Sequence, residues 1–129
     1  MRNPLFLIFT LILSVSAFSI EGALISTGNL GADNALVEIE PKSFENGKLV
    51  FTMYVNTHTV SFEFFNLKES TTLYINGKEI KPISVPDLYS HHNEGELVFN
   101  VPGKIGSNVK IVIADMAGES SREFIWEGL

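Results

Sequence analysis

The sequence predicts an all-β domain: an antiparallel β-sandwich of the immunoglobulin or fibronectin-III type with about seven strands. Apolar and polar residues alternate through several short segments, as they do in half-buried strands. Turn-forming residues separate these segments about every eight to twelve residues, the spacing typical of such sandwiches. No segment after residue 19 keeps the 3.6-residue period of an amphipathic helix.

The first 19 residues are expected to be a secretory signal peptide that precedes the domain. Arg2 supplies positive charge, residues 4–19 are almost wholly apolar, and Ala17 and Ser19 provide the small side chains that precede a cleavage point. An uncleaved anchor is the alternative, but a spanning helix needs about 20 apolar residues. We therefore expect a secreted or periplasmic protein that does not contact the membrane once the segment is cleaved.

The amino-acid composition excludes several classes of binding partner and of cysteine-dependent chemistry. The chain has 129 residues, about one domain, and a formal net charge of −6. An acidic surface repels nucleic acid and anionic lipid, so neither is an expected partner. The chain has no cysteine, which excludes disulfides, thiol metal ligands and a cysteine nucleophile.

The domain is placed at residues 34–129. Residues 20–33 before it are small, Gly-rich and weakly patterned, and they are expected to form a flexible leader. The first strand of the domain is predicted at 35–40 and is closed by Pro41. A turn is expected at 44–47.

The middle of the chain contains the clearest strand and the clearest turn. Residues 48–56 alternate strictly. Residues 59–65 either form another strand or cross over the open end of the core, and the sequence leaves both possibilities open. A hairpin follows, with strands 71–75 and 78–81 joined by Asn76-Gly77, which suits a turn with two positive φ angles.

The last third of the chain alternates again after a long loop. Residues 82–95 contain two prolines and end in glycine, so they are expected to form that loop. Three further strands are predicted at 96–101, 108–114 and 121–126. Phe124 and Trp126 are expected to cap the core, with Arg122 stacked on an aromatic ring or paired with a carboxylate.

The three histidines of the chain all fall in or beside predicted loops. His58 lies just after the strand 48–56, and His91 and His92 lie side by side before the strand 96–101. Alternate loops of a sandwich gather at one end, so these side chains and Met116 are expected to point into one region. If residues 59–65 formed a full strand, His58 would lie at the opposite end.

This cluster predicts a metal site. Neutral imidazole is a good ligand for zinc and copper, so we expect His58 and His91 to be ligands and His92 to be a ligand or an outer group. Met116 would favour Cu(I), because a thioether is a soft donor. The structural interpretation is that the histidines are simply exposed and that Met116 fills the end of the core. The carboxylates that could complete the site are Asp87, Glu94 and Asp115.

Three segments resemble the motifs of a family of small exported bacterial and archaeal proteins that brings no established activity. Residues 56–60 match its Asp/Asn-Thr-His-Ser/Thr-Val motif. Residues 90–99 match Gly-His-His-x-x-Gly-x-Leu-x-Phe, with Ser90 in place of the first glycine. Residues 118–126 match a Gly-x-x-x-Arg-x-Phe-x-Trp ending, so the resemblance covers about residues 37–126. It places all three histidines on motif positions, which favours the metal site.

Two functions of different classes follow. The leading hypothesis is an exported metal-binding domain for copper or zinc. The alternative is a metal-free secreted immunoglobulin-like module, structural or docking an unidentified protein partner through the same loop end or through Phe62, Phe64 and Phe65. A weaker likeness of residues 74–80 and 113–118 to bacterial immunoglobulin-like modules supports the fold. Since no Ser-His-Asp order, P-loop or nucleotide fingerprint appears, we assign no catalytic residues and favour a role other than catalysis.

Overall fold

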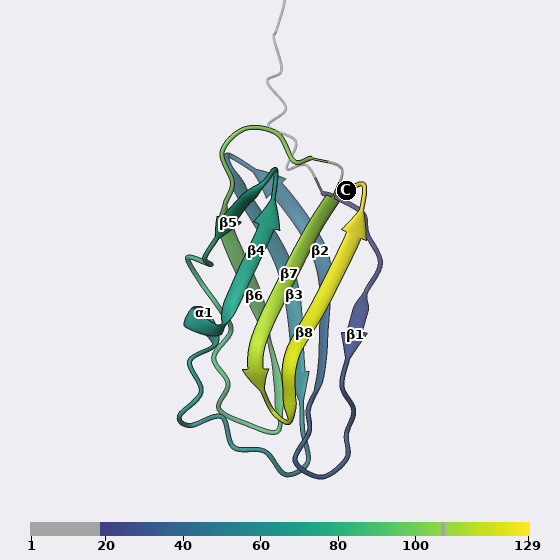
Figure 1. Ribbon diagram of the computed structural model, residues 1–129, viewed down its shortest axis with the longest axis vertical. Coiled ribbons are helices and arrows are strands. Elements are labelled where there is room, and N and C mark those ends of the chain that lie inside the picture. The colour runs from purple at the N-terminus through teal and green to yellow at the C-terminus, as the bar shows by residue number, and fades with distance from the viewer. Residues whose placement is uncertain (1–18, 107) are drawn as a thin grey trace, which may run out of the picture.

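Two four-stranded antiparallel sheets pack face to face in the computed structural model, which describes residues 19–106 and 108–129 (Figure 1). The first sheet has the order β1-β2-β3-β6 and the second has the order β5-β4-β7-β8. The predicted sandwich is therefore confirmed, with eight strands instead of about seven. The predicted signal peptide lies outside the described residues apart from Ser19. The elements are β1 (Ile25–Thr27), β2 (Leu36–Glu45), β3 (Lys48–Asn56), α1 (Leu67–Ser70), β4 (Thr71–Ile75), β5 (Lys78–Ile80), β6 (His92–Asn100), β7 (Asn108–Met116) and β8 (Glu119–Glu127).

The additional strand, β1, comes from the segment that was expected to be a flexible leader. It pairs antiparallel with β2, with Ile25 opposite Ile39. The indole N–H of Trp126 also donates to the carbonyl oxygen of Ala23 at 2.7 Å. The leader prediction was therefore wrong for this segment. A three-residue strand is too short to show alternation, and side chains of β8 far along the sequence hold it in place.

Strand β2 continues through Pro41, where the sequence predicted its end. Its pairing with β3 shifts between Pro41 and Ser43, so Lys42 sits in a β-bulge. A bulge accommodates proline because the extra residue interrupts the ladder where the missing N–H would otherwise be needed. The predicted four-residue turn shrinks to Asn46 and Gly47, whose φ angles are 53° and 75°.

The centre of the chain follows the prediction closely. Strand β3 has the predicted bounds, and Asn76 and Gly77 have φ angles of 53° and 71°, as the predicted hairpin turn requires. No strand forms within residues 57–66, which instead cross from the first sheet to the second and end at α1. The crossover interpretation is therefore confirmed. Among the described residues, no helix has the length and apolar character needed to cross a membrane.

Strands β6, β7 and β8 extend further than predicted. β6 begins at His92 instead of residue 96, β7 ends at Met116, and β8 begins at Glu119. The outward residues at these strand ends are polar, so the sequence there resembles that of a loop. The backbone is nevertheless paired with the neighbouring strands. The register of β3 with β6 runs from Lys48 opposite Asn100 to Asn56 opposite His92.

The core lies between the inward faces of the two sheets. Trp126 packs on Phe51 with ring centroids 5.1 Å apart, and Phe51 meets Phe99 edge-on at 6.0 Å. Phe124 and Trp126 are both buried, which confirms that the last strand caps the core. These rings contribute large apolar areas and fix the two sheets together.

The two ends of the sandwich differ (Figure 1). At one end β3 and β7 finish and β6 and β8 begin. We call this end the loop pole, and it consists of residues 28–35, 57–66, 85–91 and 117–118. The opposite end, the turn pole, consists of residues 46–47, 76–77 and 101–106.

Candidate functional site at the loop pole

A buried threonine organises the loop pole. Thr57 is fully buried, and its hydroxyl donates to the carbonyl oxygen of Asn34 at 2.9 Å while it accepts from the backbone N–H of Val60 at 3.0 Å. The backbone N–H of Thr57 donates to the carbonyl oxygen of His91 at 2.9 Å. These bonds fix the turn that carries His58 and tie it to two other segments of the pole.

A buried asparagine shapes the neighbouring loop. Asn93 accepts from the backbone N–H groups of Tyr89 at 3.0 Å and Ser90 at 3.1 Å through its side-chain oxygen. Its amide nitrogen donates to the carbonyl oxygens of Val55 at 3.2 Å and Ser90 at 2.8 Å. All the hydrogen-bonding capacity of this side chain is thus used to close the turn that presents Tyr89 and His91 to solvent.

Arg122 is the largest fully buried side chain among the described residues. It lies in the interior of the protein beneath the loop pole. The sequence suggested an aromatic or carboxylate partner, but the guanidinium instead bonds oxygen atoms at the ends of strands and loops. Burial lowers the pKa of Arg122 from its ordinary value, and the nearby Glu119 opposes this effect. Five N–H donors in a fixed fork can satisfy several carbonyls at once, which a carboxylate partner would not achieve. The acceptors, at 2.9 to 3.3 Å, are the carbonyls of Thr27, Ala35, Met116 and Ala117, the hydroxyl of Thr27 and the side-chain oxygen of Asn34.

The three histidines lie at the loop pole, as the sequence predicted. His58 follows Thr57, whose N–H bonds His91, and His92 opens β6 directly opposite Asn56. All three are exposed. The Nδ1 atom of His92 lies 2.8 Å from the side-chain oxygen of Asn56, so that ring is oriented by a neighbour across the ladder.

Met116 does not share that surface. It is the last inward-facing residue of β7 and is fully buried, so the structure places its thioether in the core and away from the exposed imidazoles. Within the part of the chain that the structure describes, no group of three or more His, Cys, Asp or Glu residues is placed to hold a metal ion.

A groove separates the two loops that carry the histidines. It consists of two adjoining hollows of about 500 and 380 Å³, both lined by Phe62, Glu63 and Leu88. The larger hollow reaches His91, and the smaller one reaches Lys68. We call this feature, between residues 59–68 and 85–91, the loop-pole groove.

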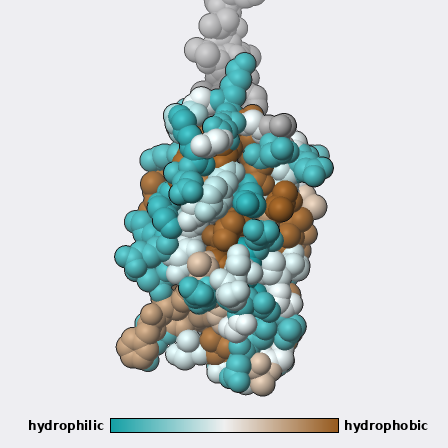
Figure 2. All heavy atoms as spheres, in the orientation of Figure 1, coloured by the Kyte–Doolittle hydropathy of each residue, from teal (hydrophilic) through white to brown (hydrophobic). Residues whose placement is uncertain are grey.

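Two solvent-exposed aromatic side chains lie beside this groove. Phe64 is 95% exposed and Tyr89 is 86% exposed, more than any other large apolar residue described. In Figure 2 apolar atoms project from the loop-pole end of the molecule. Sequence analysis named Phe64 but missed Tyr89. The available signal was an aromatic residue within an otherwise polar loop.

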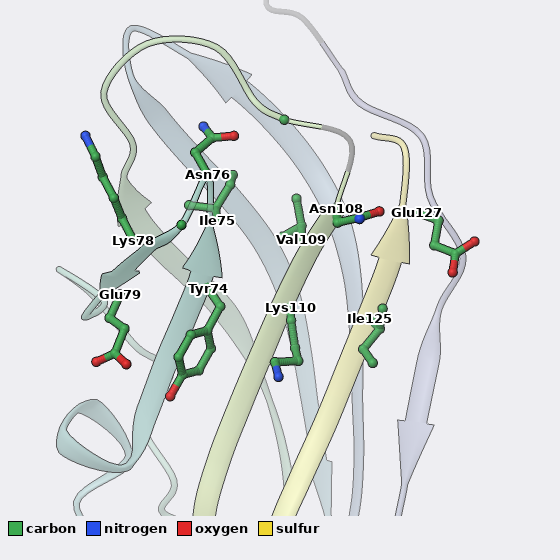
Figure 3. Close-up of a pocket in the computed structure, with 12 residues that line it drawn as sticks. Tyr74, Ile75, Asn76, Lys78, Glu79, Asn108, Val109, Lys110, Ile125 and Glu127 are labelled. Carbon is green, nitrogen blue, oxygen red and sulfur yellow. The ribbon is translucent and has the colours of Figure 1, made fainter.

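A larger hollow of the described surface lies elsewhere. It measures about 720 Å³ and lies on the outer face of the second sheet towards the turn pole, with the side chains of Tyr74, Lys110 and Ile125 along it (Figure 3). The ammonium of Lys110 lies 5.1 Å from the ring centroid of Tyr74 and 3.9 Å from the carboxylate of Glu123. Lys110 thus already has partners within the protein, so this face gives less reason than the loop pole to infer a partner.

Comparisons with known proteins assign no relative. No family model, no curated protein and no solved structure matches the chain. The resemblance of the histidine segments to an exported family thus stays a prediction. The function has to be argued from the geometry of the loop pole itself.

Proposed function

We propose that the protein is an exported binding module that holds a protein partner at its loop pole. The exposure of Phe64 and Tyr89 is the observation that carries this proposal. Burying a phenyl ring stabilises a protein by about 1.5 to 3 kcal/mol relative to leaving it in water, and the fold forgoes this gain at Phe64. Loops at one end of an immunoglobulin-type sandwich commonly serve binding, and tyrosine offers a large contact area at low entropic cost.

Buried polar residues beneath Phe64 and Tyr89 support the idea that the loops hold these two rings in fixed positions. Thr57 and Asn93 use their side chains to fix the two loops. A partner therefore meets loops that are already ordered, which reduces the entropy lost on binding. The support for export is the composition of residues 1–19.

A site-specific crosslinking experiment tests this function. A photo-reactive phenylalanine analogue replaces Phe64 or Tyr89 in the producing cell, and Ile125, half exposed on the second sheet, provides the matched control position. We expect a discrete adduct of one protein at positions 64 and 89 and none at 125. Equal adducts at all three positions, or none at 64 and 89, would reject the proposal.

We propose a second function, copper or zinc binding at the same pole, which is supported by backbone contacts that put the chain at His58, His91 and His92 at the same end of the sandwich. His91 with His58 or His92 would hold the ion, and water would complete its coordination. Titration of metal-free, untagged protein with Cu(II) or Zn(II) should show one-to-one binding that His58→Ala or His91→Ala weakens at least tenfold. Met116→Leu should leave it unchanged, since that side chain is in the core. A Kd weaker than about 1 mM for the unaltered chain would dispose of this function.

A further inference from the structure

We infer that the partner presents a basic polypeptide segment, carrying Lys or Arg side chains, to the loop-pole groove. This inference rests on the proposed binding function and names the chemistry of the partner. It follows from the negative charge of the pole and from the aromatic rings beside the groove. The same charge also disfavours the other possible binding partners.

Exposed acidic residues outnumber exposed basic residues among the described residues of the loop pole. Lys68 is the only exposed basic residue of the described loop-pole segments and the helix beside them, and the buried Arg122 is shielded. Acidic residues outnumber it there, so the potential over the groove is negative and favours a cationic partner. The exposed acidic residues of these segments and the helix are Asp33, Glu63, Glu69 and Asp87, and exposed Asp115 lies next to them near the end of β7.

The groove itself combines carboxylates with aromatic rings. Glu63 lines it from one loop and Asp87 from the other, with the exposed rings of Phe64 and Tyr89 on the same two loops. A guanidinium or ammonium group gains from both, since it pairs with a carboxylate and is attracted to the face of a ring. Hollows of about 500 and 380 Å³ lie within the size range of ligand sites and have room for side chains of a short extended segment.

Charge argues against the other occupants. Nucleic acid and anionic membranes carry the same sign as this pole and are repelled. A second copy would bring a second set of carboxylates against the first, because a two-fold interface pairs the same patch with itself. A basic segment of another protein is the occupant that remains complementary.

Short peptides provide the probe. Nine-residue peptides of alternating Gly and Arg, Gly and Lys, Gly and Glu, or Gly and Leu are titrated into isotope-labelled protein, and backbone amide shifts are recorded. The Arg and Lys peptides should shift the amides of residues 59–64 and 87–91, and the Glu peptide should shift none. The double variant Glu63→Gln/Asp87→Asn should weaken Arg-peptide binding at least fivefold.

Two controls separate a built site from general attraction between charges. Glu79→Gln/Glu127→Gln removes the same charge from exposed positions outside the loop pole and should change binding less than twofold. Phe64→Ser keeps every charge and should weaken it at least threefold. Shifts spread over the outer face of the first sheet, or equal losses in both double variants, would overturn the inference.

The remaining outcomes distinguish this inference from the proposed function. If the Leu peptide shifts the groove and the basic peptides do not, the basic partner is excluded while a binding role at the loop pole stands. If basic peptides bind as expected but crosslinking at positions 64 and 89 gives no adduct, the groove chemistry holds and the cellular function fails. If no peptide shifts the groove, the inference is rejected.

Discussion

The backbone N–H of Thr57 donates to the carbonyl oxygen of His91 at 2.9 Å, and this hydrogen bond joins the two loops that frame the loop-pole groove. It extends the pairing of β3 with β6 by one step beyond Asn56 and His92. The bond therefore connects the two walls of the groove to two neighbouring strands. Loops built in this way open together with the strand ends that support them.

Thr57→Val should destabilise the protein and loosen this pole. The variant keeps the shape of the side chain but leaves the Asn34 carbonyl and the Val60 N–H without their partner, and such a loss typically costs about 1 to 3 kcal/mol. Urea unfolding measures the change. Thr52→Val, on the half-exposed outer face of β3, should stay within about 0.5 kcal/mol. Equal effects of the two substitutions would show that the buried hydroxyl has no special role.

Arg122→Met should reduce the free energy of unfolding by about 3 kcal/mol or more, because several buried carbonyl oxygens lose a charged donor at once. Arg122→Lys should recover only part of this loss, since one ammonium cannot reproduce the planar fork. Thermal and urea unfolding of both variants test this. A methionine variant as stable as the unaltered chain would mean that the burial of the guanidinium offsets its hydrogen bonds.

Removal of residues 1–33 should lower the stability of the protein relative to removal of residues 1–19 alone. The longer deletion takes away β1, the Ala23 acceptor of Trp126 and the Thr27 acceptors of Arg122. We expect a loss of about 2 kcal/mol or more, read as a lower thermal midpoint. Identical midpoints would restore the flexible-leader interpretation of residues 20–33.

The error over β1 illustrates what alternation in a sequence can and cannot predict. Strand β3 was predicted to the residue because its nine positions alternate and both of its neighbours pair with it. Strand β1 has three residues, and its position depends on hydrogen bonds from Trp126 and Arg122 almost a hundred residues away. No local pattern encodes a contact of that kind.

The same distinction applies to the loop pole. Sandwich topology predicted that His58, His91 and His92 would lie at one end only on the condition that residues 59–65 form a crossover and not a strand, and the sequence left that condition open. The burial of Met116 agrees with the structural alternative and not with its assignment as a metal ligand. The sequence could not decide between them, because whether β7 stops before or after this residue depends on a two-residue turn at Ala117 and Gly118 with φ angles of 45° and 81°. The roles of Thr57 and Asn93 were also missed, since side-chain bonds to distant backbone leave no periodic trace in the sequence.

Phe64→Ser should barely change the stability of the protein, whereas Phe62→Ala should lower it strongly, although the two residues lie in the same loop. Phe64 is 95% exposed, so its loss should change the free energy of unfolding by less than about 0.5 kcal/mol. Phe62 is 7% exposed and belongs to the core, so its truncation should cost about 3 kcal/mol or more. Urea unfolding distinguishes them. A strongly destabilised Phe64→Ser would mean that the ring serves the fold and not a partner.

The outer face of the first sheet carries a tyrosine whose titration reports on its acidic neighbours. The hydrogen bond from Tyr54 to Glu40, 2.9 Å long, raises the pKa of Tyr54, and desolvation and the charges of Glu40, Glu94 and Glu38 add to this. Because the folded pKa exceeds the unfolded value of about 10, the resulting stabilisation is complete below that pH. It is lost as the pH rises through the folded pKa.

Glu40→Gln should therefore bring the pKa of Tyr54 down towards its ordinary value. Phenolate absorbance followed through an alkaline titration measures the midpoint, and Tyr54→Phe identifies the contribution of this residue to the curve. An unchanged midpoint in Glu40→Gln would show that the Glu40 hydrogen bond is not the main cause of the raised pKa.

The two described ends of the chain lie together at the turn pole. Ile20 bonds Lys42 near the Asn46–Gly47 turn, and Gly22 lies against Leu129 (Figure 1). A nine-residue strand spans about 30 Å, so a tether at either terminus would hold Phe64 and Tyr89 roughly that far from its attachment point. Grafted to a bead, a fusion protein or a cell envelope, the molecule would offer its aromatic tip outward without any rearrangement.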